Sequence, residues 1–265
     1  MSGFDIAAVE ASIVGTEFAG RVMHWASVGS TNALALEAAQ AGARGGVWVA
    51  DEQTAGRGRG GHGWHSAAGD GLYVSALVAP PLPMTDALRL SLATGLAARA
   101  AIEEVTGLTV DIRWPNDLLI DRRKCGGILV ETAVAPDGTL RYAVIGVGIN
   151  MNHAAFPEEI APFATSLRIA LGRLFSREAL LAAVLRRLDD EIRLLLHACG
   201  GDDGRELLER FAKASSWVSG KRVRVEESGG YTGVTAGLDA RGFLLVDGED
   251  GVRHTVLSGG VRELA

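Results

Sequence analysis

A glycine-rich segment in the N-terminal half of the chain carries two arginines that could close over an anion. It runs from Gln53 to Trp64 and holds five glycines, Gly58 among them, together with Arg57 and Arg59. Accessible backbone N–H groups and guanidinium groups are the donors that bind phosphates and carboxylates. We therefore expect a flexible loop that a bound anion orders. An exposed linker with solvated arginines is the alternative interpretation.

The same loop contains the spacing G-x-G-x-x-G that is typical of dinucleotide-binding proteins. That motif works because a helix follows the glycines and its N-terminus holds the pyrophosphate. Here the glycines lead into the apolar run Leu72–Leu77, which is typical of a strand. The sequence therefore disfavours a dinucleotide-dependent oxidoreductase.

A second cluster of polar and charged residues follows a tryptophan–proline pair. The motif Trp114-Pro115-Asn116-Asp117 is followed by Lys124, which stands directly before Cys125-Gly126-Gly127 and an apolar run. A lysine in this place can reach along the edge of a pocket toward an anionic group. Asn116 and Asp117 can be turn formers after the proline, although an acidic residue beside phosphate-binding cations also suits magnesium.

Two shorter polar segments are also candidates. Ser30-Thr31-Asn32 stands where a helix begins, so a helix cap is its simplest interpretation. An apolar strand ends at Asn150, whose amide either forms a turn or reads the hydrogen-bonding edge of a ligand.

Strands and helices must hold these segments in place. A proline at position 115 excludes an uninterrupted central strand there, and a Pro-Asp-Gly turn at 136–138 predicts a hairpin. Short β runs follow position 217, so we expect a domain of residues 1–216 and a small β-barrel of residues 217–265. The expected strands are 21–25, 47–50, 72–77, 110–120, 127–133, 141–148, 222–226, 231–238, 243–246 and 253–257, and the expected helices are 31–42, 85–106, 176–197 and 206–214.

Composition and charge narrow the class of protein. The chain has 265 residues, of which 48% are hydrophobic, and its formal charge is −6, which is a poor match for a polyanion such as DNA. Cys125 and Cys199 lie far apart, outside any paired zinc-ligand spacing, and neither a signal peptide nor a membrane-spanning apolar run is evident. We therefore expect a cytoplasmic protein that binds neither nucleic acid nor membrane.

In this order and spacing, the polar segments resemble the catalytic core of biotin protein ligases. The resemblance extends from about Arg21 to the C-terminal β runs. It implies an α+β fold, with a mixed sheet flanked by helices as in class II synthetases and biotin/lipoate ligases, and an SH3-like C-terminal barrel. The matching segments are Ser30–Asn32, Glu52–Gly60, Trp114–Asp117, Lys124–Leu129 and Gly146–Asn150.

The resemblance also implies a reaction. Biotin and Mg-ATP would give biotinyl-5'-AMP, and a lysine of the biotin carboxyl carrier domain of an acyl-CoA carboxylase would then take the biotinyl group. Arg57 and Lys124 would be the catalytic residues. By the same resemblance, biotin would contact Ser30, Thr31, Asn32, Gln53, Arg57, Gly58, Arg59 and Lys124, and the nucleotide would contact Arg59, Asn116, Asp117 and Asn150.

The chain differs from some members of this family at its N-terminus and at position 113, and other functions are still open. Only about twenty residues precede the first expected strand, where family members that also act as repressors carry a winged helix-turn-helix, so the monofunctional type is expected. Arg113 stands where many relatives have lysine. A lipoate-type ligase and a non-catalytic biotin- or nucleotide-sensing module are the alternatives. We expect a monomer or weak homodimer, and the ligands of any metal ion stay open.

Overall fold

The apolar runs of the first 150 residues form a seven-stranded mixed sheet. The computed structural model describes residues 3–198 and 204–264. In the large sheet the strand order is β1-β2-β3-β7-β6-β5-β4; β1 and β2 are parallel and the other neighbours are antiparallel. The strands are β1 Val22–Val28, β2 Gly46–Gln53, β3 Gly71–Val78, β4 Asp111–Arg113, β5 Asp117–Ile120, β6 Arg123–Val134 and β7 Leu140–Asn150.

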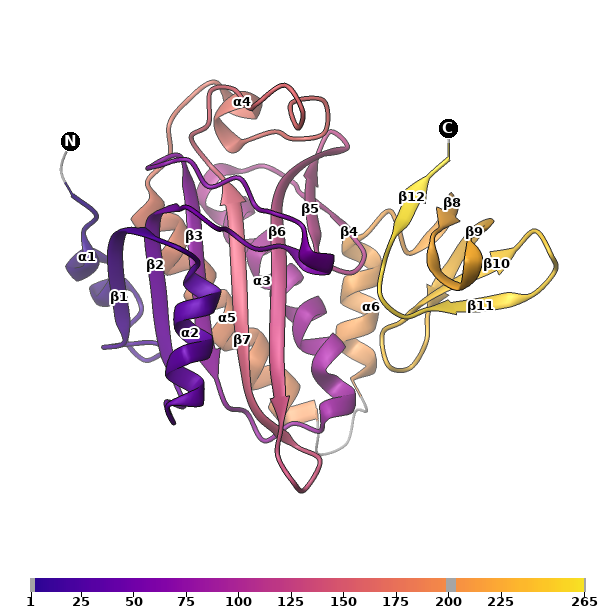
Figure 1. Cartoon of the computed structure of the whole chain (residues 1–265), viewed down its shortest axis with the longest axis horizontal. Coiled ribbons are helices and arrows are strands. Elements are labelled where there is room, and N and C mark those ends of the chain that lie inside the picture. The colour runs from indigo at the N-terminus through magenta and orange to yellow at the C-terminus, as the bar shows by residue number, and fades with distance from the viewer. Residues whose placement is uncertain (1–2, 199–203, 265) are drawn as a thin grey trace.

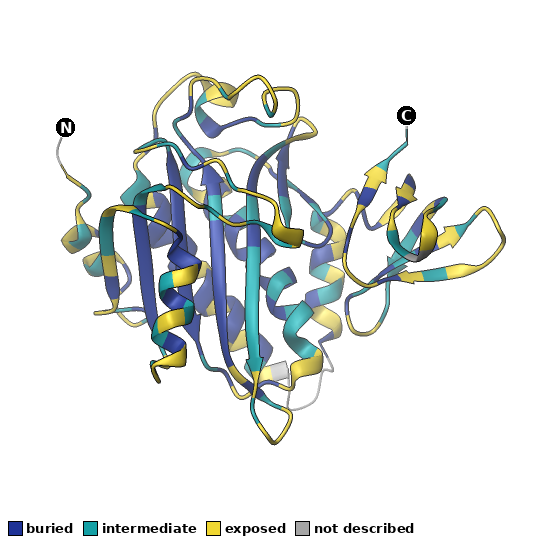
Figure 2. Cartoon of the chain, in the orientation of Figure 1, coloured by how far each residue is buried: buried dark blue, intermediate teal, exposed yellow. Residues whose placement is uncertain are grey.

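Helices cover the two faces of this sheet unequally (Figure 1). Helices α3 (Ala87–Thr106) and α5 (Arg177–Ala198) pack on one face and enclose the main core. On the other face, α2 (Thr31–Gln40) packs on β2, β3 and β7 through a smaller cluster that includes Trp48 and Tyr142. The face of β6 beyond α2 is therefore only half-buried (Figure 2), and the 53–64 loop crosses the sheet there.

Three further helices complete the first part of the chain. Helix α1 (Ile6–Ser12) packs on α5, the short α4 (Leu167–Leu171) follows β7, and α6 (Arg205–Ala214) packs on α3. None of the helices in residues 3–198 and 204–264 is both long enough and apolar enough to cross a membrane.

The last part of the chain forms a five-stranded antiparallel sheet that is joined to the core at the tryptophan–proline motif. The Trp114 indole N–H donates to the Gly242 carbonyl at 2.9 Å. The backbone at Gly259 lies close enough to the core that an added methyl group would come within 3.7 Å of Arg59 and 3.8 Å of Pro115. The sheet order is β11-β10-β9-β8-β12, formed by β8 Ser219–Val225, β9 Tyr231–Leu238, β10 Leu244–Gly248, β11 Arg253–Val256 and β12 Val261–Glu263.

The predicted fold class is confirmed: a mixed sheet flanked by helices precedes a small antiparallel β unit. Helix α6 ends at Ala214 and β8 begins at Ser219, so the predicted boundary between residues 216 and 217 falls in the connection and stays a prediction. Three short elements, α1, α4 and β12, were not predicted. Cys199 lies outside the described residues.

Candidate active site

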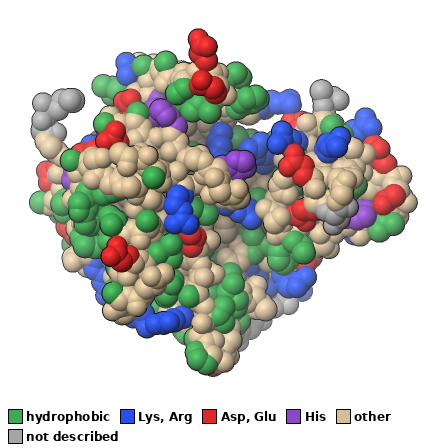
Figure 3. Space-filling view, in the orientation of Figure 1, with side chains coloured by type: hydrophobic (Ala, Val, Ile, Leu, Met, Phe, Trp, Pro, Cys, Tyr) green, Lys and Arg blue, Asp and Glu red, His purple; other side chains and the backbone are tan. Residues whose placement is uncertain are grey.

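Segments far apart in the sequence line one cavity on the open face of the large sheet. Its wall includes the start of α2, the end of β2, the 53–64 loop, and residues of β3, β6 and β7. Lys and Arg side chains gather beside the recess between the core and the C-terminal sheet (Figure 3). Nine of the predicted residues line this cavity: Ser30, Thr31, Asn32, Gln53, Arg57, Gly58, Arg59, Asn116 and Lys124.

The inner end of the cavity is a network of hydroxyl and amide groups. Ser30 is the N-cap residue of α2, but its side chain makes no capping hydrogen bond. The Thr31 hydroxyl donates to Gln53 Oε1 at 3.1 Å and accepts from Ser75 at 2.8 Å. Ser75 is also close to Asn32 Oδ1. These side chains are therefore held by tertiary contacts and present fixed donors and acceptors, which suits a small polar ring.

Two glycines of β7 make room for this network. A methyl group at Gly146 would lie 2.2 Å from Asn32 Oδ1, and one at Gly148 would lie 2.6 Å from the Trp64 indole. Both positions have ordinary backbone conformations, so glycine is not needed there for its backbone freedom. It is needed because the side chains of Asn32 and Trp64 approach the strand closely. The strand thus forms a flat floor on which Asn32 and Trp64 rest.

The 53–64 loop lies over the cavity and is held by side chains at two points. Arg57 pairs with Glu131 of β6 at 2.6 Å, and Arg59 donates to Asn116 Oδ1 at 3.4 Å. Within the loop, the Gly58 N–H donates to the His62 carbonyl at 2.7 Å. Burial lowers the pKa of Arg59, opposed by the charges of Asp117 and Glu227. A partly desolvated guanidinium of this kind interacts strongly with an anion.

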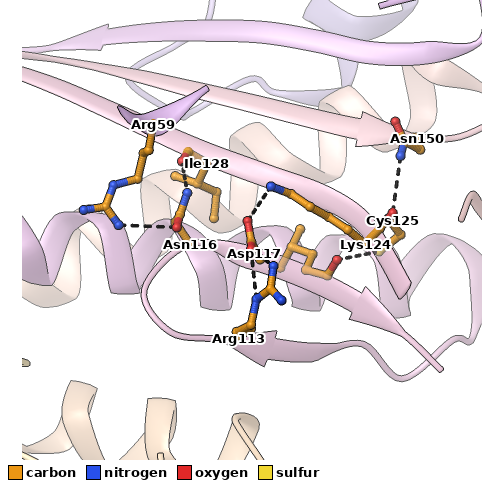
Figure 4. Close-up of polar contacts among 9 residues, drawn as sticks. Arg59, Arg113, Asn116, Asp117, Lys124, Cys125, Ile128 and Asn150 are labelled. Atoms are coloured by element: carbon orange, nitrogen blue, oxygen red, sulfur yellow. Dashed lines mark hydrogen bonds and ion pairs between the residues drawn. The ribbon is translucent and has the colours of Figure 1, made fainter. Parts of the chain in front are cut away.

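Lys124 lies in a charged triad at the edge of the cavity (Figure 4). Its ammonium is 2.5 Å from Asp117 Oδ1 and 5.2 Å from the centre of the Trp64 ring. Arg113 approaches the other oxygen of Asp117, with its Nε at 3.0 Å. Burial alone would raise the pKa of Asp117, but the charges of Lys124 and Arg113 outweigh it and hold the pKa below its usual value. Asp117 therefore fixes the position of Lys124.

The hairpin between β5 and β6 sets the direction of Lys124. Asp121 and Arg122 form its turn with positive φ angles of 48° and 66°, a conformation typical of tight hairpin turns. Cys125, which directly follows Lys124, is buried, and its thiol contacts the Leu118 carbonyl at 3.4 Å. Burial raises the pKa of Cys125 to about 12, so this thiol is not a nucleophile at neutral pH.

The carboxylates beside the cavity, Asp117 and Glu131, are both paired with cations. Within residues 3–198 and 204–264, no group of three carboxylate, histidine or cysteine side chains is arranged around a metal. Asp117 is neutralised by two cations, and Glu131 is bound to Arg57 and Asn32. Magnesium commonly retains several waters and is bound through the phosphates of a ligand, so a phosphate-bearing ligand could bring such an ion with it.

A second, mostly apolar cavity of about 210 Å³ adjoins the first. Trp64 and Lys124 line both cavities, and Phe156, Ile160 and Phe163 line the second. Asn150 lies here rather than in the first cavity, and its amide donates to the Thr165 carbonyl at 3.1 Å. Lys124 is thus placed between the first cavity, called the polar cavity below because its inner end is polar, and the mostly apolar second one.

Sequence reasoning missed several residues of this site. Glu131 directly follows the apolar run 128–130, and a charge in the middle of a strand was the available signal. Ser75 gives no such signal, because its role depends on the pairing of β3 with β7. Trp64 was noted only as part of the loop, and the aromatic residues of 156–163 were not predicted.

Comparison with known proteins identifies the family of this chain. Residues 24–150 match the biotin/lipoate A/B protein ligase family, and residues 218–261 match the biotin protein ligase C terminal domain. The chain is 35% identical over 243 residues to the biotin--[acetyl-CoA-carboxylase] ligase of Mycobacterium tuberculosis, covering 89% of this chain and 85% of that protein. The chain belongs to the biotin protein ligase family.

Other members extend the comparison. The bifunctional ligase/repressor BirA of Bacillus spizizenii is 34% identical over 231 residues, which are 85% of this chain and 69% of that protein. The structure of the biotin protein ligase from Aquifex aeolicus in complex with biotin and ATP superposes with a TM-score of 0.78 at 30% identity, covering 92% of this chain and all of that one. The present biotin protein ligase thus shares both the core and the C-terminal part with proteins of this family.

Proposed function

We propose that this chain activates biotin with ATP to form biotinyl-5'-AMP and then transfers the biotinyl group to a lysine of a biotin carboxyl carrier protein. The observation that carries the proposal is the position of Lys124 between two unlike cavities. One cavity ends in amides and hydroxyls and the other in aromatic and aliphatic side chains. Two different substrates can therefore meet at one fixed ammonium group.

Biotin fits the polar cavity by its chemistry. Its ureido ring offers one carbonyl acceptor and two N–H donors, which Ser30, Thr31, Asn32 and Gln53 can complement at the inner end. Its carboxylate would then extend toward Arg57, Gly58 and Lys124 at the outer end.

The nucleotide fits across the second cavity. A flat base suits the apolar wall formed by Trp64 and Phe163, with Asn150 beside it. The phosphates would then lie toward Lys124, Arg59 and Asn116, which line the polar cavity. Asp117 acts beneath the surface by holding Lys124, so its contribution to nucleotide binding would be through that lysine.

The first chemical step joins two anions. An oxygen of the biotin carboxylate attacks the α-phosphorus of ATP, and pyrophosphate leaves. Because negative charge accumulates where the two groups meet, the fixed cations Lys124 and Arg57 lower the barrier. In the second step the neutral amine of the carrier lysine attacks the biotinyl carbonyl, an amide forms, and AMP leaves.

The loop has a separate task between these steps. A mixed anhydride is hydrolysed by water, so it must stay covered until the acceptor lysine arrives. Loop residues 57–63 lie over the cavity in this structure and are held through Arg57 and Arg59. A loop fixed at two points can open for the carrier without unfolding the sheet.

The remaining parts of the proposal concern the surroundings of the enzyme. We expect the carrier to be the biotin carboxyl carrier domain of an acyl-CoA carboxylase, as the name of the Mycobacterium tuberculosis relative suggests. We also expect a monomer or weak homodimer in the cytoplasm. The buried free thiol of Cys125 is consistent with a reducing compartment.

One experiment tests the reaction class. The protein is mixed with biotin, Mg-ATP and a purified carrier domain, and the mass of the carrier is followed. The proposal expects the mass to rise by one biotinyl group, with AMP and pyrophosphate formed in equal amounts. A carrier that stays unmodified while the protein binds biotin would favour a sensing module, and a gain of a lipoyl group in a parallel reaction with lipoate would favour a lipoate-type ligase.

A further inference from the structure

Glu131 contributes a carboxylate to the edge of a site that otherwise presents cations, amides and hydroxyls to its ligands. It lies on β6, and its side chain is 23% exposed. Because side chains alternate along a strand, Glu131 points to the same face as Gly127 and Leu129, which line the polar cavity. The apolar run 128–130 before it gives no reason for an acid at this position, so its contacts must explain it.

The two oxygens of Glu131 bind groups from two different walls of the cavity. Oε2 accepts from the Asn32 amide at 2.9 Å, and Oε1 pairs with Arg57 at 2.6 Å. Asn32 belongs to the first turn of α2, whereas Arg57 belongs to the loop above the cavity. One carboxylate therefore joins the fixed inner wall to the covering loop.

The chemistry of Asn32 makes this link directional. Because the Glu131 carboxylate can only accept, the donor Nδ2 faces Glu131, and Oδ1 is left facing the Ser75 hydroxyl. A carboxylate only accepts hydrogen bonds, and it has two oxygens that can serve two donors at once. A glutamine in the same place would turn its NH₂ group toward either Asn32 Nδ2 or Arg57, both of which are donors, so in this geometry it cannot serve the two together.

We propose that Glu131 is a positioning residue that couples the filling of the polar cavity to the closing of the 53–64 loop. This inference rests on the proposed function for the identity of the ligand, biotin. A ligand that contacts Asn32 steadies the amide, and the amide steadies the carboxylate that holds Arg57. Glu131 itself touches no reacting atom; it acts through Asn32 and Arg57.

Trypsin provides a direct measure of loop closure. Cleavage after Arg59 requires the loop to open, whereas cleavage after the exposed Arg44 reports on a distant segment and serves as an internal reference. In E131Q without ligand we expect cleavage after Arg59 to be about fivefold faster than in the wild type. This factor corresponds to the upper range of the stabilisation that partly exposed ion pairs provide. Biotin should protect this bond in the wild type and protect it much less in E131Q.

A matched variant separates this role from a general loss of an ion pair. Glu104 also accepts from arginines, Arg186 at 2.6 Å and Arg187 at 2.7 Å, and is similarly covered, with 33% of its side chain exposed. E104Q should leave cleavage after Arg59 at the wild-type rate. In the biotinylation of a carrier domain, E131Q should raise the KM for biotin more than it lowers kcat, whereas E104Q should change neither.

A second variant covers the case in which E131Q does not fold. E131D keeps the charge but is one methylene shorter, so it should also fail to span both donors and should speed cleavage after Arg59. Wild-type cleavage and full biotin protection in a folded E131Q or E131D would overturn the inference. If the wild-type enzyme does not biotinylate a carrier, the proposed function is refuted. The comparison of cleavage rates between the wild type and the Glu131 variants without ligand still decides the role of Glu131.

Discussion

Replacing Lys124 by methionine removes the ammonium and keeps most of the side chain's volume. In the structure this ammonium is 2.5 Å from Asp117 and lies between the two cavities. One preorganised charge-stabilising donor is worth about 100- to 1000-fold in rate. We expect a value near the lower end, about 100-fold, because Asp117 already offsets part of the charge and Arg57 remains.

The effect on folding should be much smaller than the effect on rate. Asp117 keeps Arg113 as a partner, so the K124M variant does not leave an uncompensated buried carboxylate. The Lys124 side chain is also 33% exposed, which weakens the pair through solvent screening. We expect the free energy of unfolding to fall by about 1 kcal/mol, and the variant to stay folded.

The assay is pyrophosphate release from biotin and Mg-ATP at saturating concentrations, followed in a single turnover. Lys221 provides a matched control, because it too is paired with a carboxylate, that of Glu263 at 3.2 Å, and lies 5.7 Å from the centre of a tryptophan ring. K221M should release pyrophosphate at the wild-type rate. A folded K124M with unchanged release, or a K221M that is equally slow, would refute the electrostatic role given to Lys124.

Two further predictions concern packing and pH. G146A should weaken biotin binding by about tenfold or more in calorimetry, because the added methyl displaces Asn32, whereas G95A, whose methyl would meet neighbours at 3.6 Å, should bind normally. Burial lowers the pKa of His153 to about 4, so the unfolded chain binds more protons than the folded one between that value and about pH 6.5, and stability should fall as the pH is lowered through this window. In H153Q the urea midpoint should depend less on pH from 7 to 5; an unchanged slope would contradict this assignment.

The long elements could be predicted because their signals are local. Helix α3 has apolar residues at helical spacing and ends at Thr106, where Gly107 follows with φ of 76°. The hairpin of β6 and β7 follows from two apolar runs around a Pro-Asp-Gly turn. In contrast, α4 has five residues and β12 has three, so neither is long enough to show a periodicity.

The site was predicted in part, and the residues that were missed share a cause. Local motifs identified Lys124, the arginines of the loop and the start of α2. Glu131 and Ser75 matter only because strand pairing brings them to Asn32, and one sequence cannot show that pairing. Asp117 suggested magnesium by its type, which stays open; its two cationic partners, which the sequence did not show, add a second role, that of holding Lys124.

The hydrogen bond from Trp114 to the Gly242 carbonyl has a consequence for protein engineering. Trp114 lies two residues before Asn116 and three before Asp117, so the attachment of the C-terminal strands and the geometry of the cavity edge at Asn116 and Asp117 share one short segment. Chimeras that exchange the tail between homologous enzymes should therefore keep activity only when the transplanted piece offers an acceptor at the same place as residue 242. A tail chosen for its own stability alone would be expected to fold and still leave the enzyme slow.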